Sequence, residues 1–350
     1  MHLFYAGFLV FAIIILQNFV FKFIWKTKLS YTINFSAKEA FEGDEIYLIE
    51  QLQNMKHFAI PYTYIRTVLP LGIENNDNTF LQSLFYIGSY KTITKRRKIE
   101  CKKRGLYKLR YSCLVSYNWL FTKKYFYDVP LIDGLTVFPK LLDELDDIKI
   151  SLQNLESIVL SQKLLNPDPF EFYALREYVP TDTFKSINFK ASAISQKLMV
   201  NVHHPTSNLK IKLILNINSI NENNTAETTE YAIQICATIA NYFAGLGASI
   251  GLISNGRDER TLEPIYLYNG SSEGHLIKIF ECLARLNIYL KPCMIDTFFD
   301  AYNDFDNFYI FVSPSKEEKF IDYYNEIISS GTSAVLITPS IENPNQFCYN

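Results

Sequence analysis

Residues 209–219 read LKIKLILNINS, an apolar run that two lysines interrupt and a polar Asn-Ile-Asn-Ser ends. A short run rich in Leu and Ile that stops at turn-forming residues is typical of a buried strand. Residues 225–246 then change to helical spacing and stop at Gly247. One face of this predicted helix carries Ala232, Ile235, Cys236 and Ile239. The stretch therefore predicts a strand followed by a helix.

The same alternation continues toward the C-terminus. The sequence predicts strands at 248–253, 308–312 and 334–337, helices at 273–286 and 316–329, and a turn at Ser254-Asn-Gly-Arg. Alternating strands and helices favour a mostly parallel sheet covered on both faces, which is an α/β domain. Such sheets bind ligands at the carboxyl ends of their strands, so the loop after Leu215 is a candidate site.

Short strands are predicted upstream, between residues 29 and 139. Their β-branched and aromatic runs are separated by Gly, Pro and Asn clusters, the pattern of an antiparallel β-sandwich. An acidic patch at residues 143–147 marks the expected junction. We therefore predict an anchor at 1–28, a β-sandwich domain at 29–145 and an α/β domain at 146–350.

The N-terminus predicts a transmembrane helix. Residues 3–21 are apolar except for Gln17 and Asn18, and a helix of this length rises about 28 Å, close to the hydrocarbon core. Trp25 and Lys26 follow, as expected at a membrane interface. The alternative is a cleaved signal peptide, which would have basic residues before the run and small residues after it. This chain has neither, which favours a retained anchor.

Charge and cysteine usage fit a cell-membrane protein with a single span and its C-terminal domains in the cytoplasm. The first lysines, Lys22, Lys26, Lys28 and Lys38, all follow the span, and positive flanks stay inside. The six cysteines form no C-x-x-C pair, which favours reduced, structural thiols. The net charge of -2 gives no support to a nucleic-acid partner.

Residues 170–200 contain Leu-Arg-Glu-Tyr-Val-Pro-Thr-Asp, then Ile-Asn-Phe-Lys-Ala-Ser-Ala, and end in Leu-Met-Val. This resembles the signature of the bacterial "domain of unknown function 58" family. The matching positions are Leu175, Arg176, Glu177, Tyr178, Pro180, Asp182, Ile187, Lys190, Ser192 and Ala193. The sequence departs from the signature at Thr181 for Gly, Lys185 for Arg, Asn188 for Asp and Phe189 for Trp.

Weaker matches to the same family occur at Arg104-Gly-Leu-Tyr, Asn118-Trp-Leu-Phe and Val137-Phe-Pro. The resemblance implies N-terminal membrane helices, a β-sandwich and a von Willebrand factor A-like domain. It also implies work beside MoxR-type AAA+ ATPases and other membrane proteins, hence an adaptor role. Such families usually have two N-terminal helices, whereas this sequence shows one.

The signature segment is the candidate partner-binding site, through Arg176, Glu177, Tyr178, Asp182, Lys185, Asn188, Phe189 and Lys190. Its charges alternate with apolar residues, and Thr181 or Asp182 could cap a short helix from Thr183. Two interpretations stay open: an ion-pair network that holds the segment on the sheet, which we favour, and a docking surface for a partner.

The loop after Leu215 resembles a degenerate metal site. A von Willebrand factor A domain holds Mg²⁺ with Asp-x-Ser-x-Ser, because a hard cation prefers oxygen ligands and a carboxylate offsets its charge. This sequence has Asn216-Ile-Asn218-Ser219-Ile, so the carboxylate has become an amide. We therefore predict a metal-free loop whose amides stabilise the following turn, and no cofactor.

Two other features suggest little chemistry. Residues 95–104 hold seven basic side chains, which favour a solvated hairpin face over a lipid-binding one. His203 and His204 are adjacent, so on a strand they point to opposite faces. No catalytic motif is present. We therefore predict a protein that is not an enzyme, with a membrane-bound hydrolase or transferase as the alternative.

Overall fold

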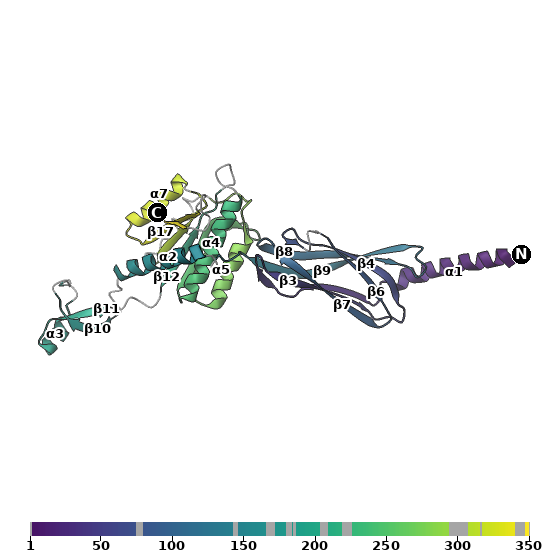
Figure 1. Cartoon of the computed structure of the whole chain (residues 1–350), viewed down its shortest axis with the longest axis horizontal. Helices are drawn as coiled ribbons and strands as arrows, with labels where there is room; N and C mark the ends of the chain where they lie inside the picture. The colour runs from purple at the N-terminus through teal and green to yellow at the C-terminus, as the bar shows by residue number, and fades with distance from the viewer. Residues whose placement is uncertain are drawn as a thin grey trace. The chain divides into compact units, whose positions relative to one another are not determined.

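The computed structural model contains two compact units, residues 1–140 and 141–350. Figure 1 shows their elements. The boundary between the two units thus falls after residue 140, a few residues before the predicted boundary after residue 145. Helix α2 (Asp146–Leu165) begins at the predicted position. The described residues are 2–74, 80–142, 146–165, 172–179, 184, 187–203, 209–218, 226–293, 307–315, 317–339 and 347–349.

The first unit begins with helix α1 (His2–Ile24) and continues as two β-sheets. Within α1, Gly7–Ile24 is long and apolar enough to cross a membrane. One sheet has the order β1 (Leu29–Phe35), β3 (Glu45–Asn54), β7 (Lys91–Cys101) and β5 (Ile73–Glu74). The other has the order β2 (Glu39–Phe41), β9 (Lys124–Phe138), β8 (Gly105–Tyr117), β4 (Ile60–Val68) and β6 (Phe80–Ile87).

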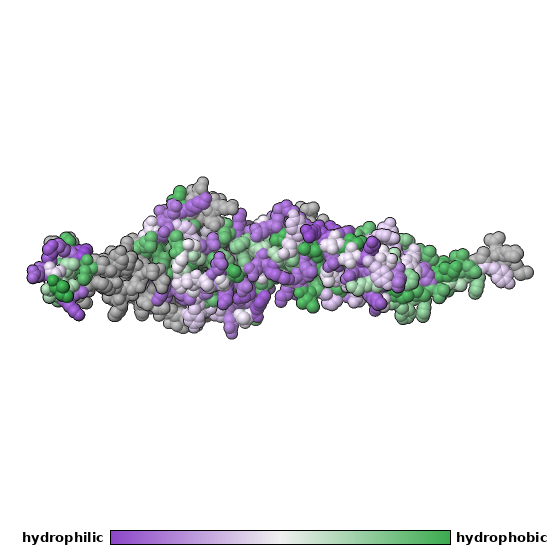
Figure 2. Space-filling model, turned by 90° about the horizontal axis from the view of Figure 1, so that it is seen from below, coloured by the Kyte–Doolittle hydropathy of each residue, from purple (hydrophilic) through white to green (hydrophobic). Residues whose placement is uncertain are grey.

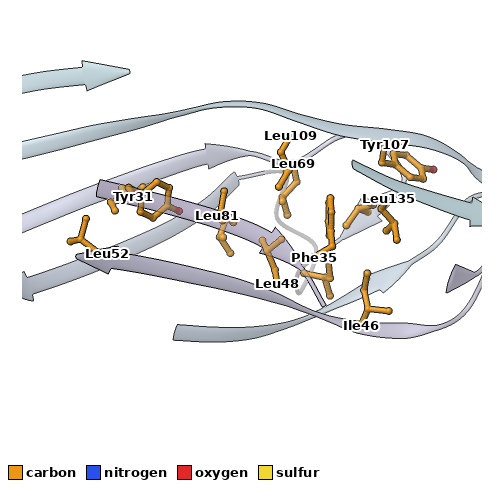
Figure 3. Packing of buried hydrophobic residues seen from close by; sticks show 14 of the residues in the cluster. Tyr31, Phe35, Ile46, Leu48, Leu52, Leu69, Leu81, Tyr107, Leu109 and Leu135 are labelled. Carbon is orange, nitrogen blue, oxygen red and sulfur yellow. The ribbon is translucent and has the colours of Figure 1, made fainter. Parts of the chain in front are cut away.

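Neighbouring strands of both sheets are antiparallel, except that β2 and β9 are parallel. Side chains alternate between buried and exposed along β1 and β3, as the sequence pattern predicts. Figure 3 shows Leu48 and Leu52 from one sheet packing with Leu81, Leu109 and Leu135 from the other. The two layers thus share one core, which is the arrangement of a β-sandwich.

The second unit contains a mixed sheet with the order β14-β13-β12-β16-β17-β18. Its strands are β14 (Pro264–Gly270), β13 (Ser249–Asp258), β12 (Lys210–Leu215), β16 (Phe308–Val312), β17 (Ala334–Pro339) and β18 (Phe347–Tyr349). The four central strands are parallel to one another. Antiparallel pairs with β14, with β15 (Leu286–Asn287) and with β18 flank them.

The predicted turn at Ser254-Asn-Gly-Arg is wrong. Strand β13 continues to Asp258, because Ser254 and Arg257 pair with β14 and Arg257 and Asp258 pair with β15. Polar residues here suggested a loop, but Ser254 and Asn255 are buried. The sequence analysis did not predict the flanking antiparallel strands β14, β15 and β18. Because of these strands, the sheet is less parallel than expected.

Helices α4 (Ala226–Gly245), α5 (Glu273–Arg285) and α7 (Glu318–Ser329) correspond closely to the predicted helices. Both faces of the central sheet are covered, since all but the first residue of β12 are buried. On one face, Phe311 packs against Phe320, Tyr323 and Tyr324 of α7. The core of this unit therefore surrounds the parallel strands.

The signature segment forms a small module of its own. Strand β10 (Phe172–Glu177) pairs antiparallel with β11 (Met199–His203), and helix α3 (Phe189–Ser195) lies between them in the chain. These two strands form a separate two-stranded sheet and do not extend the mixed sheet. We call β10, α3, β11 and the described residues between them the signature module.

Candidate functional site

Helix α3 is fixed to β11 by short-range polar contacts. The Asn188 side chain caps α3 by accepting from the Ala191 N–H at 3.0 Å. The Ser192 hydroxyl donates to the Asn188 carbonyl at 2.7 Å and accepts from the Met199 N–H at 2.8 Å. Asn caps a helix about as well as Asp, so this departure from the family signature keeps the local structure.

The charged residues of the module include a surface ion pair. Glu177 forms an ion pair with Lys197, and both side chains are largely exposed, so solvent screens the pair. The Arg176 guanidinium donates to the Glu177 carbonyl at 3.2 Å. Predicted residues Asp182 and Lys185, like the proposed cap at Thr181 or Asp182, lie outside the described residues. The Glu177–Lys197 pair thus links two residues within the module and does not attach the module to the mixed sheet.

Three large apolar residues of the module lie largely in solvent, whereas Ile187 and Val200 are buried. Phe184 is 77% exposed, Phe189 74% and Ile194 80%. The ring of Tyr178 lies 6.0 Å from that of Phe184, and α3 buries none of its residues. Sequence reasoning named Tyr178, Phe189 and Lys190 but missed Phe184 and Ile194. The sequence shows that Phe189 and Ile194 are apolar, but it does not show that neither residue is buried in a core.

The predicted metal loop lies at the carboxyl ends of three neighbouring parallel strands. Asn216 follows β12, Asn255 lies in β13, and Ser313 follows β16. The Asn216 amide donates to Asn218 Oδ1 at 2.6 Å and to Ser313 Oγ at 3.1 Å, and its oxygen accepts from Asn255 Nδ2 at 2.9 Å. The Asn218 amide donates to Ser315 Oγ at 2.5 Å.

These amides satisfy one another. Asn216 Oδ1 and Asn218 Oδ1 each accept a hydrogen bond from another side-chain amide of the protein. The amide oxygens of the loop therefore already have hydrogen-bond partners. Ser219 lies outside the described residues. Within the described chain, no three His, Cys, Asp or Glu side chains are grouped to hold a metal ion. Sequence reasoning missed Asn255, Ser313 and Ser315, which β13 and β16 bring to Asn216 from elsewhere in the chain.

The basic run at residues 95–104 does not form one charged face. Alternation along β7 turns Lys95 and Arg97 toward β6, where they donate to the carbonyls of Leu84 and Gln82. Arg97 also lies 3.4 Å from the buried carboxylate of Glu50. The Lys98 ammonium pairs with Glu45. Part of the run therefore braces the sandwich, and part is solvated.

An apolar groove of about 630 Å³ lies on the outer face of the sheet that contains β4 and β8. Its lining includes Tyr62, Tyr64, Cys113, Phe121 and Phe126. Burial, and then the bond to Asp128, raises the pKa of the Cys113 thiol. A cysteine nucleophile needs the opposite shift, so the groove gives no support to cysteine catalysis.

Five cysteines are free thiols, namely Cys101, Cys113, Cys236, Cys282 and Cys293. Burial raises the pKa of Cys236 to about 12, and burial together with Asp44 and Glu100 raises that of Cys101 to about 11. Both thiols therefore stay protonated at neutral pH and serve as small apolar groups in the cores.

Residues 174–292 match the family model described as "Protein of unknown function DUF58". The match starts in the signature module and extends past α5, and it supports the resemblance found in the sequence. No curated protein matches the chain at a significant level.

Several solved β domains share a distant likeness. A CARDB domain from Pyrococcus furiosus is 11% identical, with a TM-score of 0.20, over 29% of this chain and 93% of that one. A non-cellulosomal cohesin from Archaeoglobus fulgidus is 11% identical, with a TM-score of 0.22, over 31% and 91%. A ScaB type I cohesin from Pseudobacteroides cellulosolvens is 10% identical, with a TM-score of 0.21, over 31% and 91%. Similarities this low carry no argument about function.

Proposed function

We propose that this chain is a membrane-anchored, non-enzymatic interaction protein. In this proposal it works with an AAA+ ATPase of the MoxR type in the assembly or maturation of other proteins. The observation that carries it is the exposed apolar surface of the signature module, at Phe184, Phe189 and Ile194. Exposed apolar side chains that cluster in one small module are a common mark of a protein–protein contact. All but the first two residues of the module lie within the segment that matches the family model.

The second unit fits the von Willebrand factor A-like part of the proposal. Four central parallel strands are covered by helices, and a loop of amides occupies the position where such a domain would hold its metal. The internally paired amides support a binding mode that uses side-chain contacts in place of a shared ion.

The membrane anchor is the other part of the proposal. Phe21 in the last turns of α1 and Trp25 just after the helix are buried against the β-sandwich. Cleavage after the apolar run would remove Phe21 from that contact, which supports a retained helix over a signal peptide. The lysines that follow α1 support a cytoplasmic location for both units.

The test is nucleotide-dependent capture. The full chain, tagged at its C-terminus, is recovered from gently solubilised membranes with and without ATP, beside a triple variant of Phe184→Ala, Phe189→Ala and Ile194→Ala. We expect the unchanged chain to recover an AAA+ ATPase in a nucleotide-dependent way and the variant to lose most of it.

A matched control is Tyr268→Ala, which removes a similarly exposed ring from strand β14 outside the module. We expect it to recover the ATPase like the unchanged chain. Equal recovery by the triple variant would reject the module as the binding surface. Recovery of the chain without any ATPase would reject the adaptor function.

A further inference from the structure

The C-terminal turns of α1 are built into the β-sandwich. Phe21 is 2% exposed, and its ring lies 5.2 Å from Trp119 and 5.4 Å from Tyr125. Trp25 packs against Tyr125 at 6.1 Å and Tyr127 at 6.2 Å. Aromatic pairs at these separations contribute beyond their buried area. The helix therefore leaves the sandwich as a fixed extension.

The two polar residues of the apolar run have partners at this contact. The Asn118 amide donates to Asn18 Oδ1 at 2.6 Å, and the Tyr125 hydroxyl donates to the Asn18 carbonyl at 3.0 Å. With its amide oxygen turned toward the loop, Gln17 accepts from the backbone N–H of Trp119 at 3.0 Å. Polar groups in an otherwise apolar helix are costly unless paired, and the β8–β9 loop provides the pairs.

Lys56, from the loop between β3 and β4, contacts the C-terminal end of α1. The Lys56 ammonium donates to the carbonyl of Ile24 at 3.0 Å and also to that of Trp25. These carbonyls lie at the C-terminus of α1, where a cation is favourable. Two loops, residues 55–59 and residues 118–123 with the adjoining Lys124 of β9, therefore surround the end of the helix. We call them the collar.

The apolar window of α1 overlaps the collar. This window is Gly7–Ile24, and Gln17, Asn18 and Phe21 within it contact the sandwich. A bilayer around that window would reach the loops that contact it. The outward-facing collar residues suit such a depth, because Met55, Phe58, Leu120 and Phe121 are each about half exposed. Lys123 and Lys124 lie exposed beside them.

Given the membrane anchor of the proposed function, we infer that the collar lies in the interfacial layer of the bilayer. Phe58, Leu120 and Phe121 would contact the upper acyl chains, and Lys123 and Lys124 would reach the headgroups. Lipid is the occupant because the apolar surface of α1 continues onto the adjoining end of the sandwich (Figure 2). Aromatic and lysine side chains are enriched at this depth.

The inference can be tested by tryptophan fluorescence, since the chain has two tryptophans, Trp25 and Trp119. The full chain with Trp25→Phe is reconstituted in phosphatidylcholine vesicles whose acyl chains carry bromine either near the glycerol or near the chain end. We expect shallow bromines to quench Trp119 strongly and deep bromines to quench it at least twofold less. If Trp25→Phe does not fold, the unchanged chain is used, because both tryptophans contact the collar or form part of it.

A variant pair isolates the collar. Leu120→Asp with Phe121→Asp should cut the quenching at least twofold, and Asp tolerates the positive φ of 57° at residue 121. The control is Ile132→Asp, a fully exposed site on β9 outside the collar, which should match the parent.

Alkaline extraction of the same vesicles separates this inference from the anchor. Retention in the membrane with quenched Trp119 supports both. Retention with unquenched Trp119 overturns the collar and leaves the anchor in place. Release into the alkaline wash overturns both.

Discussion

The collar and the signature module differ in how residues that do not match their surroundings are accommodated. Where α1 meets the collar, the two polar residues of its apolar run, Gln17 and Asn18, have partners within the same unit, and the ring of Phe21 is buried. In the module, the apolar residues Phe189 and Ile194 lie in solvent. The first pattern stabilises the fold of this chain. The second contributes little to folding and suits a contact with another molecule.

Phenylalanine gives the sharpest form of this comparison. Phe21 and Phe23 lie two residues apart on α1, yet Phe21 is 2% exposed and Phe23 is 56% exposed. Burial of an aromatic ring contributes to folding only where the ring leaves solvent. Residues two apart on a helix point to opposite sides, and because α1 is apolar on all sides its sequence did not show which side packs against the sandwich.

The largest expected effect comes from Phe21→Ala. Removing this ring leaves a cavity between Trp119 and Tyr125 and should lower the free energy of unfolding by about 3–5 kcal/mol. Urea unfolding of the detergent-solubilised chain, followed by tryptophan fluorescence, measures it. Phe23→Ala is the matched control and should change stability by less than about 1 kcal/mol. Equal losses would show that α1 does not pack on the sandwich.

The next effect extends the comparison to the amide loop, with Asn216→Asp. A carboxylate cannot donate to Asn218 Oδ1 or Ser313 Oγ, so we expect a loss of about 1–3 kcal/mol without metal. Mg²⁺ should recover part of it, since a carboxylate now faces oxygen ligands. Thermal unfolding with and without millimolar Mg²⁺ tests this. Saturable micromolar Mg²⁺ binding by the unchanged chain would refute the metal-free loop.

Much of the fold could be predicted because its signals are local. The helix at the N-terminus, α4 and β12 each follow from the spacing of apolar residues over one element. The end of β13 was mispredicted because Ser254 and Asn255 are polar but buried, and its last residues pair with β15 further along the chain. Local polarity there is outweighed by tertiary pairing. Strand β14 pairs with the strand just before it, and its Ile-Tyr-Leu-Tyr run was a local signal that the sequence analysis missed.

The candidate sites show the same limit. Asn18 and Asn118 lie 100 residues apart, so the sequence showed a polar exception in the helix without its partner. At the amide loop, the position after β12 followed from the rule for α/β sheets, but the contacts with Asn255 and Ser313 required the strand order. In the module, the family signature identified the segment, and the exposure of its rings required the structure.

A smaller effect concerns Lys56 at the end of α1. Although the carbonyls of Ile24 and Trp25 accept from it, desolvation by burial outweighs them and lowers its pKa from 10.5 to about 8, so the charged form costs stability below pH 8. That cost should disappear as the pH rises from about 8 to 10.5, because the unfolded chain binds more protons in this window. The unfolding midpoint of the unchanged chain should therefore rise relative to Lys56→Met. Parallel pH profiles for the two proteins would place Lys56 in solvent.

The smallest effect on stability is expected at the module. Phe189→Ala removes a ring that is 74% exposed, so the free energy of unfolding should change by no more than about 0.5 kcal/mol. Asn188→Ala, one residue earlier, removes the cap of α3 and should cost about 1 kcal/mol locally. Hydrogen exchange of the α3 amides distinguishes the two. Faster exchange in Phe189→Ala than in Asn188→Ala would mean that Phe189 holds the module together, and the contrast with the collar would fail.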